Sequence, residues 1–150
     1  MKIYTLEDAP KGARLIVCGG RNYGRPPASY DYFANTAAHE AHSRRAAEQR
    51  ARIFQTLDLL RPSEIAHGGA LGVDRAAGEW AEENTIRCTV FPARWGSGYT
   101  PGLDRNRRMF STFGPDGTVA FPGGTGTADM ERVTLGGGAF LVRIDTGVNQ

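Results

Sequence analysis

Residues 14–20 have the sequence RLIVCGG, in which a short apolar run ends at a pair of glycines. A run of this kind is typical of a strand that is buried on both faces of a parallel sheet. The same combination returns at residues 65–69, IAHGG, and at residues 118–124, TVAFPGG. The sequence therefore predicts an α/β domain in which several parallel strands each lead into a glycine-rich loop.

Segments with helical character separate these strands. The segment from about Phe33 to Leu60 contains neither Gly nor Pro, and Ile53, Phe54 and Leu57 repeat at the spacing of one helix face. We expect further helices at 72–84 and 105–113, further strands at 87–92 and 139–144, and loops at 21–32 and 93–104. Strands that alternate with helices indicate a three-layer α/β domain, with a mostly parallel sheet of about five strands and helices on both faces.

The composition fits one globular domain over residues 1–150. The 18 basic and 16 acidic residues leave a net charge of +2, which is small for a protein that coats nucleic acid, so we expect no nucleic-acid partner. No apolar stretch approaches the length of a membrane span, and the N-terminus lacks a signal-peptide core. Cys18 and Cys88 are far apart in sequence and are expected to be free thiols of a cytoplasmic protein.

The glycine-rich loops predict a binding site. The loops CGGRN (18–22), HGGALGVD (67–74) and FPGGTGTAD (121–129) follow strands whose carboxyl ends lie at one edge of a parallel sheet. Glycine lets backbone amides approach an anion, and the positive end of the following helix attracts it. Neither GxxxxGK[ST] nor GxGxxG occurs, so a P-loop for Mg-ATP is not expected. The predicted ligand-binding residues are Gly19, Gly20, Arg21, Gly68, Gly69, Gly72, Asp74, Arg75, Trp95, Arg105, Asn106, Pro122, Gly123, Gly124, Thr125, Gly126 and Thr127.

Three of the polar and aromatic positions have more than one interpretation each. Asp74 caps the helix that follows Gly72, accepts a hydrogen bond from a ribose hydroxyl, or acts as a catalytic acid or base. Trp95, together with Tyr99, either stacks on a base as part of a lid or anchors its own loop. His67 either lines the pocket or belongs to the core.

The basic helix and the histidines limit which ligands and metals the site is expected to bind. Arg105, Arg107 and Arg108 lie on one predicted helix, so one or two of them are expected to face the crevice. His39 and His42 are three positions apart, whereas the HExxH zinc motif needs four, so no metal site is expected. No cofactor is expected to be required, although a nucleotide-type ligand fits the site.

Five motifs resemble the YspA/cpYpsA-related branch of the SLOG superfamily: RLIVCGGRN (14–22), HGGALGVDRAAGEWA (67–81), FPARW (91–95), RNRRM (105–109) and FPGGTGTADM (121–130). The resemblance covers most of the chain, from about Arg14 to Ile144. It implies a Rossmann-like fold and a site for a nucleotide or nucleotide-derived ligand. The superfamily also includes the LOG phosphoribohydrolases, proposed molybdenum-cofactor carriers and the DNA-processing protein DprA, and members of this branch often occur in phages or mobile elements.

The LOG enzymes hydrolyse the N-glycosidic bond of a nucleoside monophosphate with an arginine and with the glutamate of the motif PGGxGTxxE. This chain has Met130 at the position of that glutamate. Asp129 and Glu131 flank it, but each is turned by about 100° around a helix. Arg105 or Arg108 matches the family's arginine, and Arg105, Asp129 and Glu131 are the candidates for a catalytic role.

The sequence favours a protein that binds a nucleotide-derived small molecule, as a sensor, a carrier or a sequestering protein. A nucleotide N-glycosidase with a rearranged carboxylate is the enzymatic alternative, and single-strand DNA binding like that of DprA is a further one. The Ala-rich start of the long helix predicts close packing against a second copy of the chain, through Ala34, Ala37, Ala38 and Ala41.

Overall fold

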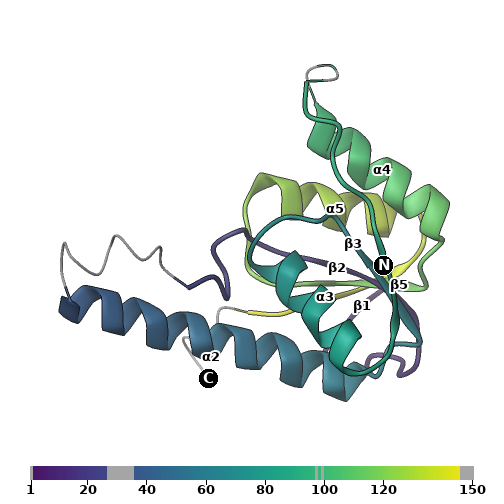
Figure 1. Ribbon diagram of the computed structural model, residues 1–150. Coiled ribbons are helices and arrows are strands. Elements are labelled where there is room, and N and C mark those ends of the chain that lie inside the picture. Colours follow the sequence, from purple (N-terminus) through teal and green to yellow (C-terminus); the bar gives the residue numbers. More distant parts are fainter. Residues whose placement is uncertain (1, 27–35, 97, 99, 146–150) are drawn as a thin grey trace.

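A computed structural model describes residues 2–26, 36–96, 98 and 100–145 (Figure 1). Its strands are β1 (Ile3–Tyr4), β2 (Arg14–Cys18), β3 (Glu64–His67), β4 (Arg87–Val90), β5 (Gly117–Ala120) and β6 (Phe140–Arg143). Its helices are α2 (Thr36–Leu60), α3 (Val73–Glu83), α4 (Pro101–Phe113) and α5 (Thr125–Gly136). The strands form one sheet in the order β1-β6-β5-β2-β3-β4, and all neighbouring strands are parallel.

The alternation of side chains along β2 explains the three layers. Leu15 and Val17 lie on the face of the sheet where α2 and α3 pack, whereas Ile16 and Cys18 lie on the face covered by α4 and α5 (Figure 1). All four side chains are buried, because helices cover both faces. The predicted α/β architecture with a parallel sheet and helices on both sides is therefore confirmed.

The order of the strands determines where a site forms. The chain runs outward from β2 to β3 and β4, then crosses back and places β5 and β6 on the other side of β2. The winding direction thus reverses beside β2, and in open parallel sheets ligands bind at the carboxyl ends of the strands that flank such a reversal. Val17 pairs with Val119 of β5, and Ile16 pairs with Ala66 of β3, so these three strands end close together.

The structure differs from the sequence prediction at two elements. The sheet gains a sixth strand, β1, which pairs Ile3 with Leu141 at the edge; it is only two residues long and exposed, so no apolar pattern marks it. Helix α4 begins at Pro101 rather than at Arg105. Proline is compatible with the first helical position, because its missing N–H is not needed there. Residues 33–35, predicted to open the long helix, lie outside the described residues.

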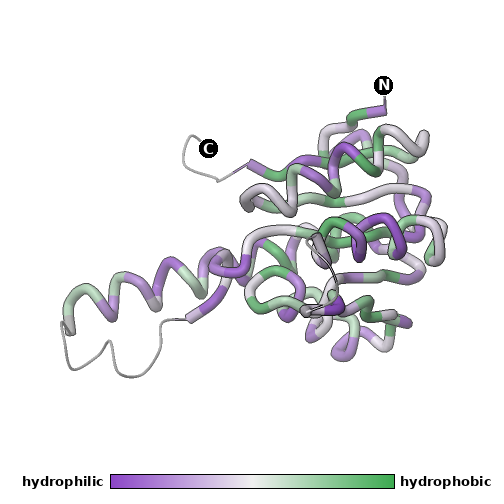
Figure 2. The backbone as a smooth tube through the Cα atoms, turned by 90° about the horizontal axis from the view of Figure 1, so that it is seen from above, coloured by the Kyte–Doolittle hydropathy of each residue, from purple (hydrophilic) through white to green (hydrophobic). Residues whose placement is uncertain are grey.

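The first half of α2 extends beyond the body of the domain (Figures 1 and 2). Its second half packs on the sheet and on α3 through Ile53, Leu57 and Leu60, which are fully buried. In the projecting half Ala37 and Ala38 are exposed, and the tube there is mostly hydrophilic or weakly hydrophobic (Figure 2). Pairing with a second copy through this half stays a prediction, and Ala34 lies outside the described residues.

Two further findings concern the described part of the chain. Cys18 and Cys88 are both free, as expected from their distance in sequence. None of the helices found in residues 2–26, 36–96, 98 and 100–145 has the length and apolar character needed to cross a lipid bilayer.

Gly117 tests how tightly β5 and β6 pack. Gly117 pairs with Phe140 of β6, whose ring is buried. A Cβ at position 117 would lie 2.5 Å from three atoms of this ring. We expect Gly117→Ala to lower the free energy of unfolding by about 1–3 kcal/mol, because a buried aromatic ring has to move. Urea denaturation measures the change. The matched control is Gly136→Ala, where an added Cβ meets nothing within 4 Å; equal stabilities of the two variants would contradict the packing.

Candidate functional site

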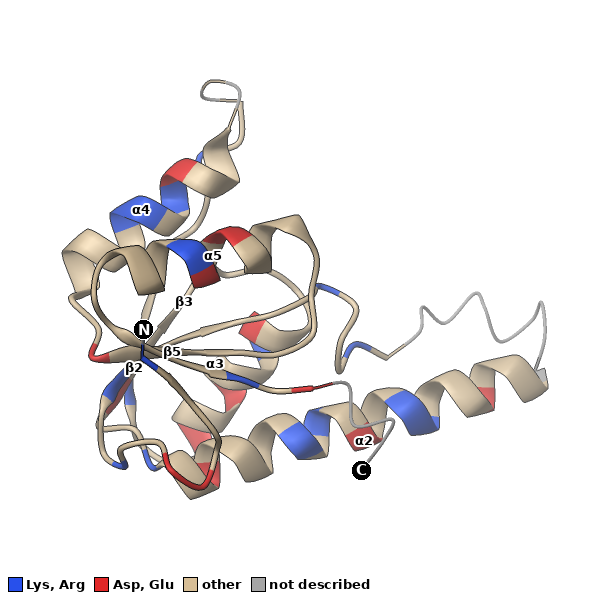
Figure 3. Cartoon of the chain, turned by 180° about the vertical axis from the view of Figure 1, so that it is seen from behind, with Lys and Arg blue, Asp and Glu red and all other residues tan. Residues whose placement is uncertain are grey.

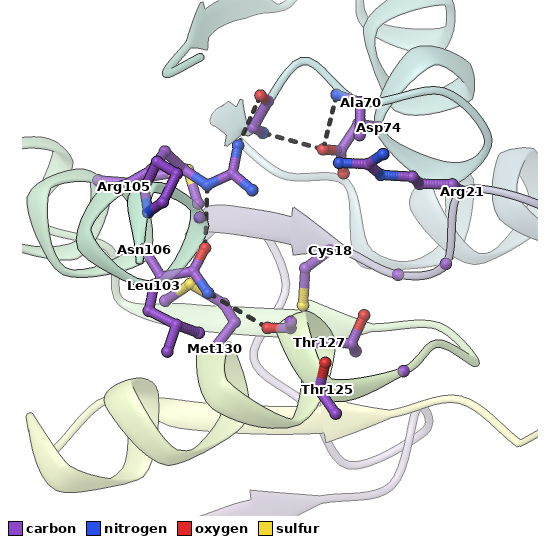
Figure 4. Close-up of a pocket in the computed structure, with 18 of the residues that line it drawn as sticks. Cys18, Arg21, Ala70, Asp74, Leu103, Arg105, Asn106, Thr125, Thr127 and Met130 are labelled. Carbon is purple, nitrogen blue, oxygen red and sulfur yellow. Dashed lines mark hydrogen bonds between the residues drawn. The ribbon is translucent and has the colours of Figure 1, made fainter. Parts of the chain in front are cut away.

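A cavity of about 660 Å³ lies at the carboxyl edge of the sheet, beside the reversal at β2. Its wall comes from the end of β2, the β3–α3 loop, Trp95, the first turns of α4 and the start of α5 (Figure 4). The described residues that line it are Val17, Cys18, Gly19, Gly20, Arg21, Gly68, Ala70, Asp74, Trp95, Thr100, Pro101, Gly102, Leu103, Arg105, Asn106, Met109, Gly124, Thr125, Gly126, Thr127, Met130 and Arg132.

Several loop glycines are required because the loops pack directly on each other. The amide of Gly20 donates to the carbonyl oxygen of Pro122 at 2.8 Å, and a Cβ on Gly123 would lie 2.8 Å from that amide nitrogen. A Cβ on Gly19 would lie 2.5 Å from Val73. Gly72 has φ +73°, and a Cβ there would overlap the carbonyl oxygens of Gly20 and Arg21. Close packing of the loops therefore explains these four glycines without a ligand.

Gly124 and Gly126 have a different environment. An added Cβ on either residue would meet nothing within 4 Å, and both line the cavity at the start of α5. No side chain caps this helix end, so the amides of the first turn lack a partner within the helix. Together with the helix dipole and the hydroxyls of Thr125 and Thr127, these amides form a surface suited to an anion.

Arg105 is held in place by the loops on its side of the cavity. Its Nη1 donates to the carbonyl oxygens of Gly68 at 2.7 Å and Phe91 at 3.2 Å, and its Nε donates to Oδ1 of Asn106 at 3.0 Å. Gly68 leaves room for this guanidinium, which a Cβ would overlap. Nη2 has no hydrogen-bond partner among the described residues and points across the cavity (Figure 4). Arg105 is thus a positioned cation with donors left for a ligand.

Asp74 is the only carboxylate among the described residues that line the cavity. Its Oδ2 accepts hydrogen bonds from the amides of Gly68 at 3.2 Å and Ala70 at 3.1 Å. The sequence left helix capping as an alternative for Asp74, but the carboxylate holds the preceding loop instead. Burial raises the pKa of Asp74 to about 6, against the opposing effect of the two amides and of the cations Arg105 and Arg21.

The floor of the cavity is apolar. Met109 of α4, Met130 of α5 and Cys18 of β2 belong to one buried cluster and line the cavity from below. Burial raises the pKa of the Cys18 thiol well above its usual value, so the thiol stays neutral. The cavity therefore combines a polar rim with an uncharged floor. Met109 lies one turn beyond Arg105, and this i, i+4 spacing in the sequence indicated a shared face.

Among the described residues, one aromatic side chain, Trp95, lies at the rim. Trp95 is 66% exposed, and the Arg21 guanidinium lies 5.5 Å from the centroid of its ring. This contact holds the two side chains together at the mouth of the cavity. Tyr99, which the sequence placed in the same lid, lies outside the described residues.

The structure does not gather every predicted residue at this cavity. Gly69, Pro122 and Gly123 are not among its lining residues. Gly72 and Arg75 line a second cavity of about 460 Å³ between α2, α3 and the loop after β2. Arg75 follows Asp74 on α3 and is therefore turned by about 100° around the helix axis.

Two residues of the basic helix and His67 lie away from the cavity. Arg107 contacts Asp129, and Arg108 donates to the carbonyl oxygen of Pro92, so Arg105 is the arginine of this helix that faces inward, as expected. His67 is buried beneath the β3–α3 loop, and its Nδ1 accepts the amide hydrogen of Gly69 at 3.0 Å. Burial and the nearby Arg105 lower the pKa of His67 to about 4.

A family model, the YspA, cpYpsA-related SLOG family, matches residues 13–98, more than half of the chain. The chain belongs to this SLOG family. The matched range contains β2, β3 and two of the glycine-rich loops, whereas α4 and α5 lie beyond it. Searches of curated proteins and of solved structures found no match. In the described part of this SLOG protein, no group of three or more His, Cys, Asp or Glu residues is arranged to hold a metal ion.

The carboxylates beside Met130 do not line the cavity and are held in ion pairs. Asp129 forms ion pairs with Arg107 at 3.3 Å and Arg132 at 3.6 Å on the surface shared by α4 and α5 (Figure 3). Asn106 also donates to Asp129 at 3.1 Å. Glu131 forms an ion pair with Arg143 of β6 at 2.7 Å. Neither carboxylate lines the cavity of this SLOG protein, whereas Met130, which is 1% exposed, does.

The shifted pKa of Asp74 predicts a pH dependence of stability. Between about pH 4 and pH 6 the folded protein keeps a proton on Asp74 that the unfolded chain has released. The free energy of unfolding therefore falls as the pH rises through this window. We expect the stability of Asp74→Asn relative to the wild type to increase by up to about 3 kcal/mol between pH 4 and pH 7.

Urea unfolding of both proteins at several pH values measures this difference. His67 has a lowered pKa and gives the opposite slope, but it is present in both proteins and cancels. A difference in stability that stays constant from pH 4 to pH 7 would show that Asp74 has an ordinary pKa in the folded protein.

Proposed function

We propose that this SLOG protein binds a phosphorylated, nucleotide-derived small molecule in the cavity at the carboxyl edge of the sheet and acts as a sensor, a carrier or a sequestering protein. The observation that carries the proposal is the start of α5. There Gly124 and Gly126 leave the first-turn amides open to the cavity, directly beside the reversal of the sheet. A phosphate is the anion that such a helix end binds best.

The size and the lining of the cavity support a small molecule of this class. A volume of about 660 Å³ lies within the range of roughly 300–1,000 Å³ that is typical of ligand sites. Arg105 and Arg21 add positive charge to the wall of the cavity, and the floor of Met109 and Met130 offers an apolar surface for a flat base. Both features suit a nucleoside phosphate.

The distribution of carboxylates supports binding rather than N-glycoside hydrolysis. Cleavage of an N-glycosidic bond needs a carboxylate near the developing oxocarbenium ion. At the floor of the cavity the chain has Met130, and the flanking Asp129 and Glu131 are held in ion pairs elsewhere. Asp74 is at the opposite side, where its Oδ2 is occupied by backbone amides.

Gly124→Val tests the phosphate position. We expect ribonucleoside 5′-monophosphates at saturating concentration to raise the melting temperature of the wild type by about 5–10 °C. The valine side chain would occupy the open space in front of the α5 amides, so the variant should lose this stabilisation. Differential scanning fluorimetry measures the shift.

Gly136→Val is the matched control, because it lies on the same helix, also has open space around its Cβ, and is not part of the cavity lining. The control should keep the full shift. Undiminished stabilisation of a folded Gly124→Val variant would refute the assignment of α5 as the phosphate site.

Base release tests the absence of hydrolysis. We expect the wild type to leave AMP intact at high protein concentration, because general acid–base help worth roughly 10²–10⁴-fold in rate is missing. Met130→Glu should gain weak hydrolysis, since it places a carboxyl group on the same helix face. Chromatography of the released base is the measurement. Release by the wild type at enzymatic rates that Asp129→Ala or Glu131→Ala abolishes would establish the enzymatic alternative.

A further inference from the structure

Asp74 has one carboxylate oxygen without a partner. The residue is 6% exposed, and its Oδ2 is held by the amides of Gly68 and Ala70. No hydrogen bond within the described residues reaches Oδ1. Because Asp74 lines the cavity, this oxygen faces the space that the ligand would occupy (Figure 4). The described residues leave this acceptor open at the wall of the cavity, where a ligand can supply the donor.

The neighbouring cations do not fill this role. Arg105 and Arg21 both lie near Asp74 (Figure 4), but the ion pairs of the described residues do not include Asp74. The Arg105 guanidinium is held by the carbonyl oxygens of Gly68 and Phe91 and by Asn106, so it is fixed away from Oδ1. The cost of burying the carboxylate is thus only partly offset within the protein.

The position of Asp74 relative to α5 limits what the donor can be. The Asp74 carboxylate accepts hydrogen bonds from the loop that follows β3, whereas α5 follows β5. Strands β3 and β5 lie on the two sides of β2. Two strand spacings put the carboxyl ends of β3 and β5 about 10 Å apart. For a ligand that spans these two ends, a contact of about 3 Å at each end leaves roughly 4 Å between its phosphate and its donor. This distance suits a hydroxyl of the sugar that carries the phosphate, whereas the polar edge of a base lies farther away.

We propose that Oδ1 of Asp74 accepts a hydrogen bond from a ribose hydroxyl of a nucleoside 5′-phosphate, which makes the site selective for ribonucleotides over their deoxy counterparts. The inference rests on the proposed function, because the distance argument needs the phosphate at the start of α5. The two amides on Oδ2 fix the orientation of the carboxylate, so that Oδ1 meets the sugar without a change of rotamer. A hydrogen bond to a charged acceptor is stronger than one between neutral groups.

Affinities for AMP, 2′-deoxy-AMP and 3′-deoxy-AMP test the selectivity. Isothermal titration calorimetry should give the wild type roughly a 10-fold or larger preference for AMP over at least one deoxy form. Asp74→Asn should reduce this preference to within about 3-fold, because the amide keeps an acceptor for the two loop N–H groups but has lost the charge. Glu82→Gln, an exposed change on the same helix, should retain the wild-type preference.

Inorganic phosphate is the probe that separates this inference from the proposed function. The three proteins should bind phosphate with the same affinity, because Asp74 does not contact it. A parallel loss of phosphate affinity in Asp74→Asn would mean that Asp74 only maintains the loop, and would overturn the inference. Equal affinity of the wild type for AMP and both deoxy forms would also overturn the inference. If the wild type still binds inorganic phosphate in that case, the proposed function stands. Failure of the wild type to bind phosphate or any of the nucleotides would overturn both.

Discussion

The close contact of three loops at the carboxyl ends of β2, β3 and β5 is the constraint on which the site depends. The amide of Gly20 donates to Pro122 of one neighbouring loop, and the carbonyl oxygen of Gly20 accepts from the amide of Val73 in the other. These bonds form only where the backbones approach each other without side chains between them. Positions 19 and 123 are therefore glycines. The contact brings the start of α5 and the β3–α3 loop to opposite sides of one cavity.

Within this frame, the charged groups of Arg105 and Asp74 are positioned by neutral groups rather than by ion pairs. Backbone carbonyls and Asn106 orient Arg105, and backbone amides orient Asp74. Groups held in this way keep free hydrogen-bonding capacity toward the cavity, whereas an ion pair between them would have consumed it. The arrangement resembles a receptor for a ligand that carries both an anion and a hydrogen-bond donor.

The surroundings of Met130 show how successive residues of one helix reach different partners. Successive residues of α5 point in directions about 100° apart. Met130 therefore reaches the cavity floor, Asp129 reaches Arg107 of α4 and Arg132, and Glu131 reaches Arg143 of β6. Each flanking carboxylate is held by an arginine. Moving either carboxylate into the cavity would therefore break an ion pair and require the helix to rotate about its axis. Membership of the SLOG family thus does not by itself determine the chemistry of this cavity, which depends on the residues that line it.

Local patterns in the sequence determined the α/β class, the strands that end in glycine-rich loops, and the position of Met130 where related hydrolases carry glutamate. These features follow from apolar periodicity and from turn residues, which act within a few positions of the chain. No local pattern indicated β1, because a two-residue edge strand depends on its pairing with β6. Only the tertiary structure decided which glycines pack against loops and which face the cavity, that Arg75 lines a different cavity, and that Asp74 retains a free oxygen. Those properties depend on distances between segments far apart in the chain, and the order of strands in the sheet determines these distances.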